Sequence, residues 1–336
     1  MTPVPLVQIV ELEGLTCFEH DAMATRYHVY LGPSDEGALR PIAEAVFRRL
    51  GELETRLSFY LEGSDVTRIN RAAPDTSLRI DEVTHHGLLT VLDMAAATAG
   101  AFDPFAGAAA LQAKSQAVPL PLADLPPPED NDRAPVISID LEQPVVTKLQ
   151  GSRWLDLGAV GKGAALDAMA EVVLEWGITT AVLMGGGSSV LVLGPPLHPT
   201  KTTWTLVLPQ LPGRPLLQLT PPFALGASGE GFQPGHIIAY HRQGSVWSQT
   251  AVVAASAAIR QMRCPPAPCC WMVIHCRLYW RMNLICLCSR FQRTENKFES
   301  ANFTDWRFRP HWSLWSFPAG VKANDSRRSS THWQPP

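Results

Sequence analysis

The sequence feature that most constrains the fold is a stretch in which an apolar run passes through closely spaced glycines into a long helical pattern. It comprises residues 153–177, RWLDLGAVGKGAALDAMAEVVLEWG. The first six residues have the character of a strand, and we predict a helix from about Lys162 to Trp176 that stops at Gly177. Any fold for this chain must therefore contain a strand-to-helix junction that another group can approach closely.

The glycine turn of this segment is a candidate anion site. Gly158, Gly161 and Gly163 surround Lys162, and a helix N-terminus offers free N–H groups and the positive end of the helix dipole. The spacing matches neither the Walker pattern, which ends in Gly-Lys-Ser/Thr, nor the Rossmann pattern G-x-G-x-x-G. A plain strand-to-helix turn explains the local pattern equally well.

Helical and strand patterns alternate along the chain before residue 260. Residues 25–31, TRYHVYL, alternate as a strand does. Apolar residues recur three or four positions apart over residues 39–58, which predicts an amphipathic helix. We expect residues 60–77 to form a polar loop, and residues 82–100 to form a second helix closed by its terminal glycine.

The middle of the chain favours an α+β fold. Residues 119–135 are rich in proline and acidic residues, so we interpret them as a surface insertion or a linker. Short strands are predicted after this insertion and on both sides of a triple glycine at residues 185–187. Helices alternate with antiparallel-looking hairpins without regular βαβ spacing. This pattern favours helices packed on antiparallel or mixed sheets over a doubly wound sheet.

Charge and cysteine usage divide the chain at about residue 260. Residues 261–336 contain 6 of the 7 cysteines and 6 of the 10 tryptophans, with 11 of the 28 basic residues and only 4 of the 31 acidic ones. The preceding body therefore has a formal charge of about −10, which argues against nucleic acid as a partner. Its single cysteine, Cys17, excludes a disulfide scaffold.

Membrane and secretion patterns are missing from the sequence. No apolar run approaches the roughly 18 residues that span a bilayer. The first residues lack a basic region and include Glu11 and Glu13, which is not typical of a signal peptide. We therefore expect a cytoplasmic protein without a transmembrane segment or a lipid-attachment motif.

Three further patterns could carry chemistry, and each has an ordinary structural alternative. The triple glycine would let a flat ligand lie against the backbone, or it would form a tight hairpin with a bulge. Ser228 lies between small residues and His236 stands at the entry to a short apolar run, although a lone histidine is more often structural than catalytic. No G-x-S-x-G elbow supports a hydrolase. Tyr60 and the polar residues that follow it could stack on a ring and hydrogen-bond its edge, or form a capped loop.

In this order, the segments resemble the ApbE family, the FAD:protein FMN transferases. The matching motifs run from Met23 to Ser256 and are MATRYHV, LSFYLEGSDVTRIN, TAGAFDPFAG, LDLGAVGKGAALD, GGG, GASG and HII. Seven motifs in family order are far more specific than any one of them. The resemblance implies an ApbE-like mixed α+β fold.

The resemblance also implies a reaction. The chain would bind FAD and, with Mg²⁺, transfer the FMN half of FAD to a Ser or Thr hydroxyl of a target protein, releasing AMP. This protein flavinylation needs neutralised phosphate oxygens, an in-line hydroxyl and a base. Magnesium prefers oxygen ligands, so carbonyl and carboxylate groups suit it.

Roles for individual residues follow from the same resemblance. Tyr60 matches the position whose ring lies against the isoalloxazine, and His236 matches the histidine that helps to activate the acceptor hydroxyl. The carbonyl of Ala159 matches a metal ligand. The other expected cofactor-binding residues are Met23, Thr25, Ser64, Asn70, Asp103, Gly158, Lys162, Asp167, Gly186, Gly187 and Ser228.

Two departures from the family pattern bear on activity. Ala239 stands where the family has an aspartate. The next family block, which supplies an aspartate and a downstream threonine to the metal site, is replaced after Ala258 by IRQMRCPPAPCC. We therefore expect an incomplete metal site and weak or absent transferase activity. The alternatives to a transferase are a non-catalytic FAD-binding remnant and a metal-dependent FAD hydrolase.

The expected organisation has three parts, which are an N-terminal extension over residues 1–16, an ApbE-like domain over 17–260 and an atypical tail over 261–336. The tail cysteines do not form two C-x-x-C knuckles, so the spacing favours neither a zinc module nor, without a secretion signal, a disulfide module. The tail lacks helix and strand periodicity, as expected if the reading frame were lost near Ile259. We therefore predict a disordered tail from a truncated or frameshifted C-terminus, which the other reading frames of the gene can test.

Overall fold

Three β-sheets and four helices make up the described part of the chain, which confirms the α+β prediction. The structure is a computed structural model. It describes residues 7–97, 102–108, 135–151, 153–209, 216–229, 250–256, 284–289 and 322–324.

Seven strands form the main sheet, and every neighbouring pair in it is antiparallel. From one edge to the other the order is β13, β12, β11, β8, β7, β3 and β2. Their bounds, in that order, are Leu284–Ser289, Thr250–Ser256, Phe223–Gly229, Ser189–Leu193, Thr180–Gly185, Thr25–Gly32 and Thr16–Ala22. The central strands β7 and β8 are buried along their whole length, as expected for strands covered on both faces.

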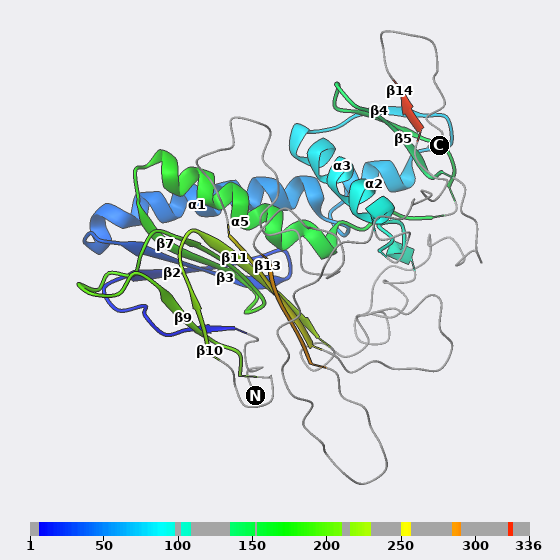
Figure 1. Cartoon of the computed structure of the whole chain (residues 1–336). Coiled ribbons are helices and arrows are strands. Elements are labelled where there is room, and N and C mark those ends of the chain that lie inside the picture. The colour runs from blue at the N-terminus through cyan, green and yellow to red at the C-terminus, as the bar shows by residue number, and fades with distance from the viewer. Residues whose placement is uncertain are drawn as a thin grey trace.

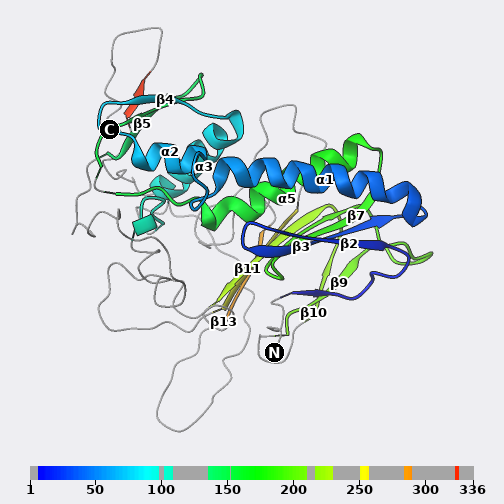
Figure 2. The same ribbon diagram turned by 180° about the vertical axis from the view of Figure 1, so that it is seen from behind.

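Two long helices cover one face of the main sheet. α1 (Glu36–Leu57) and α5 (Gly158–Glu175) cross this face side by side (Figure 1). The same layering is visible from behind (Figure 2). α1 begins after Asp35, whose carboxylate accepts a hydrogen bond from the N–H of Ala38 at 2.9 Å.

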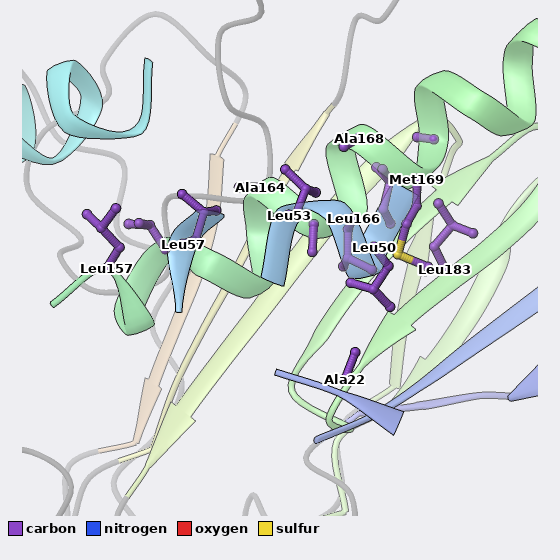
Figure 3. Close-up of a cluster of buried hydrophobic side chains, with 14 of the residues drawn as sticks. Ala22, Leu50, Leu53, Leu57, Leu157, Ala164, Leu166, Ala168, Met169 and Leu183 are labelled. Atoms are coloured by element: carbon purple, nitrogen blue, oxygen red, sulfur yellow. The ribbon is translucent and has the colours of Figure 1, made fainter. Parts of the chain in front are cut away.

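The core between these helices and the sheet includes leucines and alanines together with Met169 (Figure 3). Leu50, Leu53 and Leu57 project from α1, and each such side chain contributes about 2 kcal/mol of burial free energy. Leu57 and Leu157 lie at the same end of this cluster. The C-terminus of α1 and the N-terminus of α5 are therefore at the same end of the sheet.

A small antiparallel sheet covers the opposite face. Its strands are β1 (Gln8–Ile9), β9 (Trp204–Val207) and β10 (Leu216–Leu219), with β9 in the middle. Trp204 is fully buried, and its indole N–H donates to the carbonyl of Gly194 at 2.9 Å. Residues 8–9, which the sequence placed in an N-terminal extension, thus form part of this layer.

A third sheet stands at one end of the molecule with the two remaining helices (Figure 1). Its strand order is β14, β5, β6, β4, and the β14–β5 pair is parallel whereas the others are antiparallel. The bounds are Lys322–Asn324 for β14, Ile137–Asp140 for β5, Val145–Lys148 for β6, Ser77–Arg79 for β4, Asp65–Arg71 for α2 and Glu82–Ala97 for α3.

Several local predictions are confirmed. The strand expected over residues 25–31 is β3, and the amphipathic helix expected over 39–58 is α1. α5 ends at Glu175, followed by Gly177 with a left-handed φ of 76°. The helix expected over 82–100 is α3, although its predicted closing glycine lies outside the described residues.

The prediction of a polar loop over residues 60–77 is wrong. Part of this stretch forms α2, because Ser64 caps it by accepting a hydrogen bond from the N–H of Thr67 at 3.0 Å. Val66 and Ile69, three residues apart, then bury one side of the short helix. Their pattern was too brief to be distinguished from a loop by periodicity.

The start of α5 also differs from the sequence prediction. The helix begins at Gly158 rather than near Lys162, so the glycines lie inside its first turns. The preceding segment is not a strand; within the described residues Trp154 makes only an isolated bridge to Ala106. Burial explains the shift, because Gly161 and Gly163 pack as small helix residues against neighbouring elements.

Only part of the tail lies within the described residues. β13 pairs with β12 at the edge of the main sheet, and β14 pairs with β5. The rest of residues 261–336 lies outside the described residues, so the prediction that the tail does not fold stays a prediction. Most of the proline-rich insertion, residues 119–134, lies outside them as well.

Candidate functional site

The N-terminal turn of α5 is open to solvent. Gly158 and Ala159 are exposed, and the preceding residue Leu157 makes no side-chain capping hydrogen bond. Asp156 instead accepts a hydrogen bond from the N–H of Gly158 at 2.7 Å. The positive end of the helix dipole at this exposed turn suits an anionic ligand. Lys162 lies one turn further along and is half-buried.

The hairpin turn between β2 and β3 reaches this helix end. Ala22 pairs with Thr25, so Met23 and Ala24 form a two-residue loop, with φ angles of 51° and 56°. A Cβ atom added to Gly161 would lie 3.0 Å from the terminal carbon of Met23. The side chain of Met23 therefore rests against the first turn of α5, and glycine at 161 makes room for it.

The triple-glycine turn between β7 and β8 meets the same hairpin. Gly186 and Gly187 have φ angles of 62° and 67°, which glycine adopts without steric penalty. The N–H of Gly186 donates to the carbonyl of Arg26 at 2.9 Å. A Cβ atom at Gly186 would lie 2.6 Å from Oγ1 of Thr25. The structure thus brings together four predicted site residues, Met23, Thr25, Gly186 and Gly187, beside α5.

Tyr60 lies in the loop that joins α1 to α2. Its side chain is 52% exposed, although the residue is aromatic. Its ring packs edge-on against Phe59, with 5.5 Å between centroids, and Phe59 in turn lies 5.9 Å from Trp154. The ring of Tyr60 is therefore supported from one side and presented to solvent, which suits stacking on a planar ligand.

Ser64 and Asn70 are buried in the framework behind this loop. The hydroxyl of Ser64 donates to the carbonyl of Ser58 at 2.6 Å, in addition to capping α2. The amide of Asn70 donates to the carbonyl of Leu155 at 2.9 Å and accepts from the N–H of Leu155 at 2.7 Å. Both residues therefore fix the loop and the approach to α5 through backbone contacts.

Asp103 lies in a segment that runs beside the approach to α5. Its carboxylate accepts a hydrogen bond from the N–H of Phe105 at 2.9 Å and forms an ion pair with Arg153. Two backbone hydrogen bonds join these two segments. The N–H of Gly107 donates to the carbonyl of Trp154 at 3.0 Å, and the N–H of Asp156 donates to the carbonyl of Pro104 at 2.8 Å. The aspartate thus anchors the segment that carries Gly158.

Two cationic residues of this region were missed by the sequence analysis. The guanidinium of Arg153 lies 5.8 Å from the ring centroid of Phe105 while it pairs with Asp103. Lys148 is almost fully buried, and its ammonium donates to the carbonyl of Arg153 at 3.2 Å. Burial lowers the pKa of Lys148 to about 8. Lys148 could have been noticed as the one charged residue in the apolar strand pattern PVVTKL.

A carboxylate from α1 also belongs to this region and was missed. Oε1 of Glu54 accepts a hydrogen bond from the N–H of Met23 at 2.7 Å. Glu54 appeared only as one of several charged residues on an amphipathic helix. No local sequence pattern links it to a partner 31 residues away.

The remaining predicted site residues lie further along α5, in β11 or outside the described residues. Asp167 lies on α5 about 13 Å along the axis from Gly158, given the rise per residue. Ser228 lies near the end of β11, where its backbone pairs with that of Ala251 in β12. His236 and Ala239 lie outside the described residues.

The described part of the chain contains neither a cluster of metal-ligating side chains nor a helix that could span a membrane. Within it, no group of three or more His, Cys, Asp or Glu side chains could hold a metal ion. The carbonyl of Ala159 is an oxygen donor, but the described side chains do not complete a magnesium site around it. Among the described helices, none is both long and apolar enough to cross a bilayer.

Comparison with known proteins places this arrangement in a family. Solved structures with a similar fold include the flavin transferase ApbE from Vibrio cholerae, at 19% identity with a TM-score of 0.56, covering 71% of this chain and 81% of that one. The ApbE protein from Thermotoga maritima is 20% identical with a TM-score of 0.56, covering 72% and 82%. The Pseudomonas stutzeri flavinyl transferase ApbE is 18% identical with a TM-score of 0.56, covering 71% and 80%.

These identities are low enough that the likeness establishes the fold alone. Among curated proteins the chain has no significant match. The model of the ApbE family, however, matches residues 23–231, which is more than half of the chain. The match includes the Met23 hairpin, the Tyr60 loop, the start of α5 and the triple-glycine turn. The chain therefore belongs to the ApbE family.

Proposed function

We propose that the protein is an FAD:protein FMN transferase, which transfers the FMN half of FAD to a Ser or Thr hydroxyl of a target protein and releases AMP. One observation carries the proposal: the Met23 hairpin and the Gly186 turn meet beside the exposed first turn of α5. An open helix N-terminus with close-packed glycines suits a pyrophosphate. The exposed ring of Tyr60 suits a flavin.

The proposed reaction is a displacement at phosphorus. The acceptor hydroxyl oxygen forms a bond to the phosphorus on the FMN side of the pyrophosphate, and the bond from that phosphorus to the bridging oxygen breaks. AMP leaves with the bridging oxygen, and the hydroxyl proton passes to a base. Most of the rate in such reactions comes from positioning and charge stabilisation.

The chain's own residues would divide these tasks. The exposed first turn of α5, at the positive end of the helix dipole, would attract the pyrophosphate oxygens, and Lys162 one turn further would add positive charge. Met23, Thr25 and Gly186 would hold the cofactor against the helix end. His236 is proposed as the base because of its place in the family motif, although it lies outside the described residues.

Magnesium remains part of the proposal because the family resemblance implies it. The described side chains do not by themselves fit a magnesium site. The proposed partner is a flavin-accepting protein with a Ser or Thr acceptor.

A second candidate is an FAD-binding protein without transferase activity. Ala239 favours it, because alanine cannot supply the carboxylate that the family has at this position. Titration of FAD into the full-length protein with and without magnesium separates the two functions. Affinity that rises with magnesium supports the transferase, and saturable binding that ignores magnesium supports the non-catalytic protein.

Transfer itself is tested by co-expression with a flavin-accepting protein of the kind that ApbE proteins modify, followed by in-gel flavin fluorescence. The proposal predicts a fluorescent acceptor band that needs both magnesium and this chain, and that is weak because the family metal-site block is missing after Ala258. Tyr60→Ala should weaken the band. Leu61→Ala is the matched control, since Leu61 is a neighbouring side chain with 44% exposure in the same loop. A wild-type lane with no acceptor fluorescence would contradict transfer.

A further inference from the structure

We propose that Glu54 is a positioning residue that holds the Met23–Ala24 turn in the geometry needed to contact FAD. The proposal rests on the proposed function for the identity of the ligand. It assigns a role to a side chain of α1 that reaches the site only through the backbone of the turn.

The turn needs such support because of its residues. A two-residue hairpin with positive φ at both positions normally contains Asn-Gly or Gly-Gly. Here the two positions are Met23 and Ala24, with φ angles of 51° and 56°. Non-glycine residues are strained in this region and persist only where their surroundings fix them.

Glu54 supplies one fixed point directly at the strained backbone. It lies in the last turn of α1, where the helix ends at Leu57. Its Oε1 atom accepts the hydrogen bond of the Met23 N–H at 2.7 Å, and the contact is partly buried. A charge-assisted hydrogen bond of this length is among the stronger ones in proteins.

Tyr27 supplies a second fixed point from the other side of the turn. It is fully buried in β3, and its hydroxyl donates to the sulfur of Met23 at 3.4 Å. Burial, followed by the negative charge of Glu54, raises the pKa of Tyr27 well above its ordinary value. The hydroxyl therefore remains a donor at physiological pH. Backbone and side chain of Met23 are thus held by different elements.

Loss of the Glu54 hydrogen bond should change the geometry of the candidate cofactor site. Met23 rests against Gly161 in α5, and Thr25 rests against Gly186, with the close approaches described above. If Glu54 no longer held the N–H of Met23, the turn could relax away from these contacts. The expected effect is on FAD affinity, although the carboxylate itself bonds only to protein backbone.

The experiment compares FAD affinity in full-length variants by calorimetric titration. Glu54→Ala should weaken FAD binding about tenfold, the value of one charge-assisted hydrogen bond. Glu54→Gln should restore most of the affinity, because its amide oxygen can accept the same hydrogen bond. Glu52→Ala is the matched control, since Glu52 lies in the same helix with its exposed carboxylate paired to Arg49.

A second variant keeps the test decisive if Glu54→Ala unfolds. Ala24→Gly removes the backbone strain at one turn position. Adding it to Glu54→Ala should recover folding and at least part of the FAD affinity. Recovery of FAD affinity in folded protein, by Gln at 54 and by Gly at 24, would support positioning, whereas recovery of folding without FAD affinity would contradict it.

Two outcomes would overturn the proposal. If the wild-type protein binds FAD and Glu54→Ala binds it within about twofold, the hydrogen bond does not position the turn. If Glu54→Gln is as weak as Glu54→Ala, the charge and not the hydrogen bond is responsible. A wild-type protein that does not bind FAD at all would instead refute the proposed function.

Discussion

Two turns with the same backbone requirement face each other at the candidate site, and the chain builds them differently. Gly186 and Gly187 carry left-handed φ angles as glycines, whereas Met23 and Ala24 carry similar angles with side chains. The glycine turn needs no outside help to reach its conformation. Met23 in the other turn donates a hydrogen bond from its N–H to Glu54 and accepts one at its sulfur from the hydroxyl of Tyr27.

The two turns contribute different things to the site: one supplies backbone without side chains, and the other supplies the side chain of Met23. Gly186 leaves the space that Thr25 occupies, so this position requires a residue without a side chain. Met23 instead contributes a side chain that reaches Gly161, at the expense of backbone strain. Substitutions should therefore act in opposite directions in the two turns.

The largest expected effect comes from adding a side chain to the glycine turn. Gly186→Val should lower the free energy of unfolding by about 4 kcal/mol, because backbone strain and overpacking against Thr25 add together. Chemical denaturation measures the change. Gly63→Ala is the control, since Gly63 has a φ of 85° with open space around it. A loss at 186 no greater than at 63 would show that the contact with Thr25 is unimportant.

The segment just before α5 is held by the side chain of Asn70 and not by a neighbouring glycine turn. Asn70→Ala removes both hydrogen bonds to the backbone of Leu155, which is fully buried. The free energy of unfolding should fall by about 3 kcal/mol, because two buried backbone groups lose their partners. Denaturation should be followed together with FAD affinity. Unchanged stability would mean that water replaces the amide.

Buried Lys148, which contacts the same segment through the carbonyl of Arg153, should lower the free energy of unfolding at pH 7. Its pKa of about 8 in the folded protein lies below the ordinary 10.5. Between these pH values the unfolded chain binds more protons than the folded chain, so the free energy of unfolding should rise as pH rises. Lys148→Met should abolish this rise and stabilise the protein at pH 7 by about 2 kcal/mol. Denaturation at pH 7, 8 and 10 tests both effects; an unchanged slope would contradict them.

The smallest expected effect lies in the Met23 turn. Ala24→Gly should raise the free energy of unfolding by about 1 kcal/mol, since relief of strain exceeds the added entropy of the unfolded chain. Thermal unfolding can detect the change, with Gly51→Ala as a reference for an open helix position. Destabilisation by Ala24→Gly would mean that the two turns do not differ as described.

The sequence predicted much of this architecture because long patterns were decisive. The periodicity of residues 39–58 predicted α1, and the alternation in residues 25–31 predicted β3. The short helix α2 and the early start of α5 were missed, because both depend on capping and on tertiary burial of small residues. Periodicity does not report either effect.

The candidate site was predicted only as a set of motifs. Family order identified Met23, Thr25, Gly186 and the start of α5, and the structure shows these in contact. Glu54 could not be predicted, because its partner is a backbone atom 31 residues away, whereas Lys148 was detectable only as a charged residue within an apolar strand pattern. His236 stays a prediction, since it lies outside the described residues.

The most direct test of the site is FAD titration into the full-length wild-type protein and into Thr25→Val, a substitution of similar shape that removes the hydroxyl beside Gly186. The account predicts saturable FAD binding by the wild type and clearly weaker binding by the variant, with both proteins folded. Absence of saturable FAD binding by the folded wild type, or equal affinity of the two proteins, would contradict a cofactor site built from these two turns.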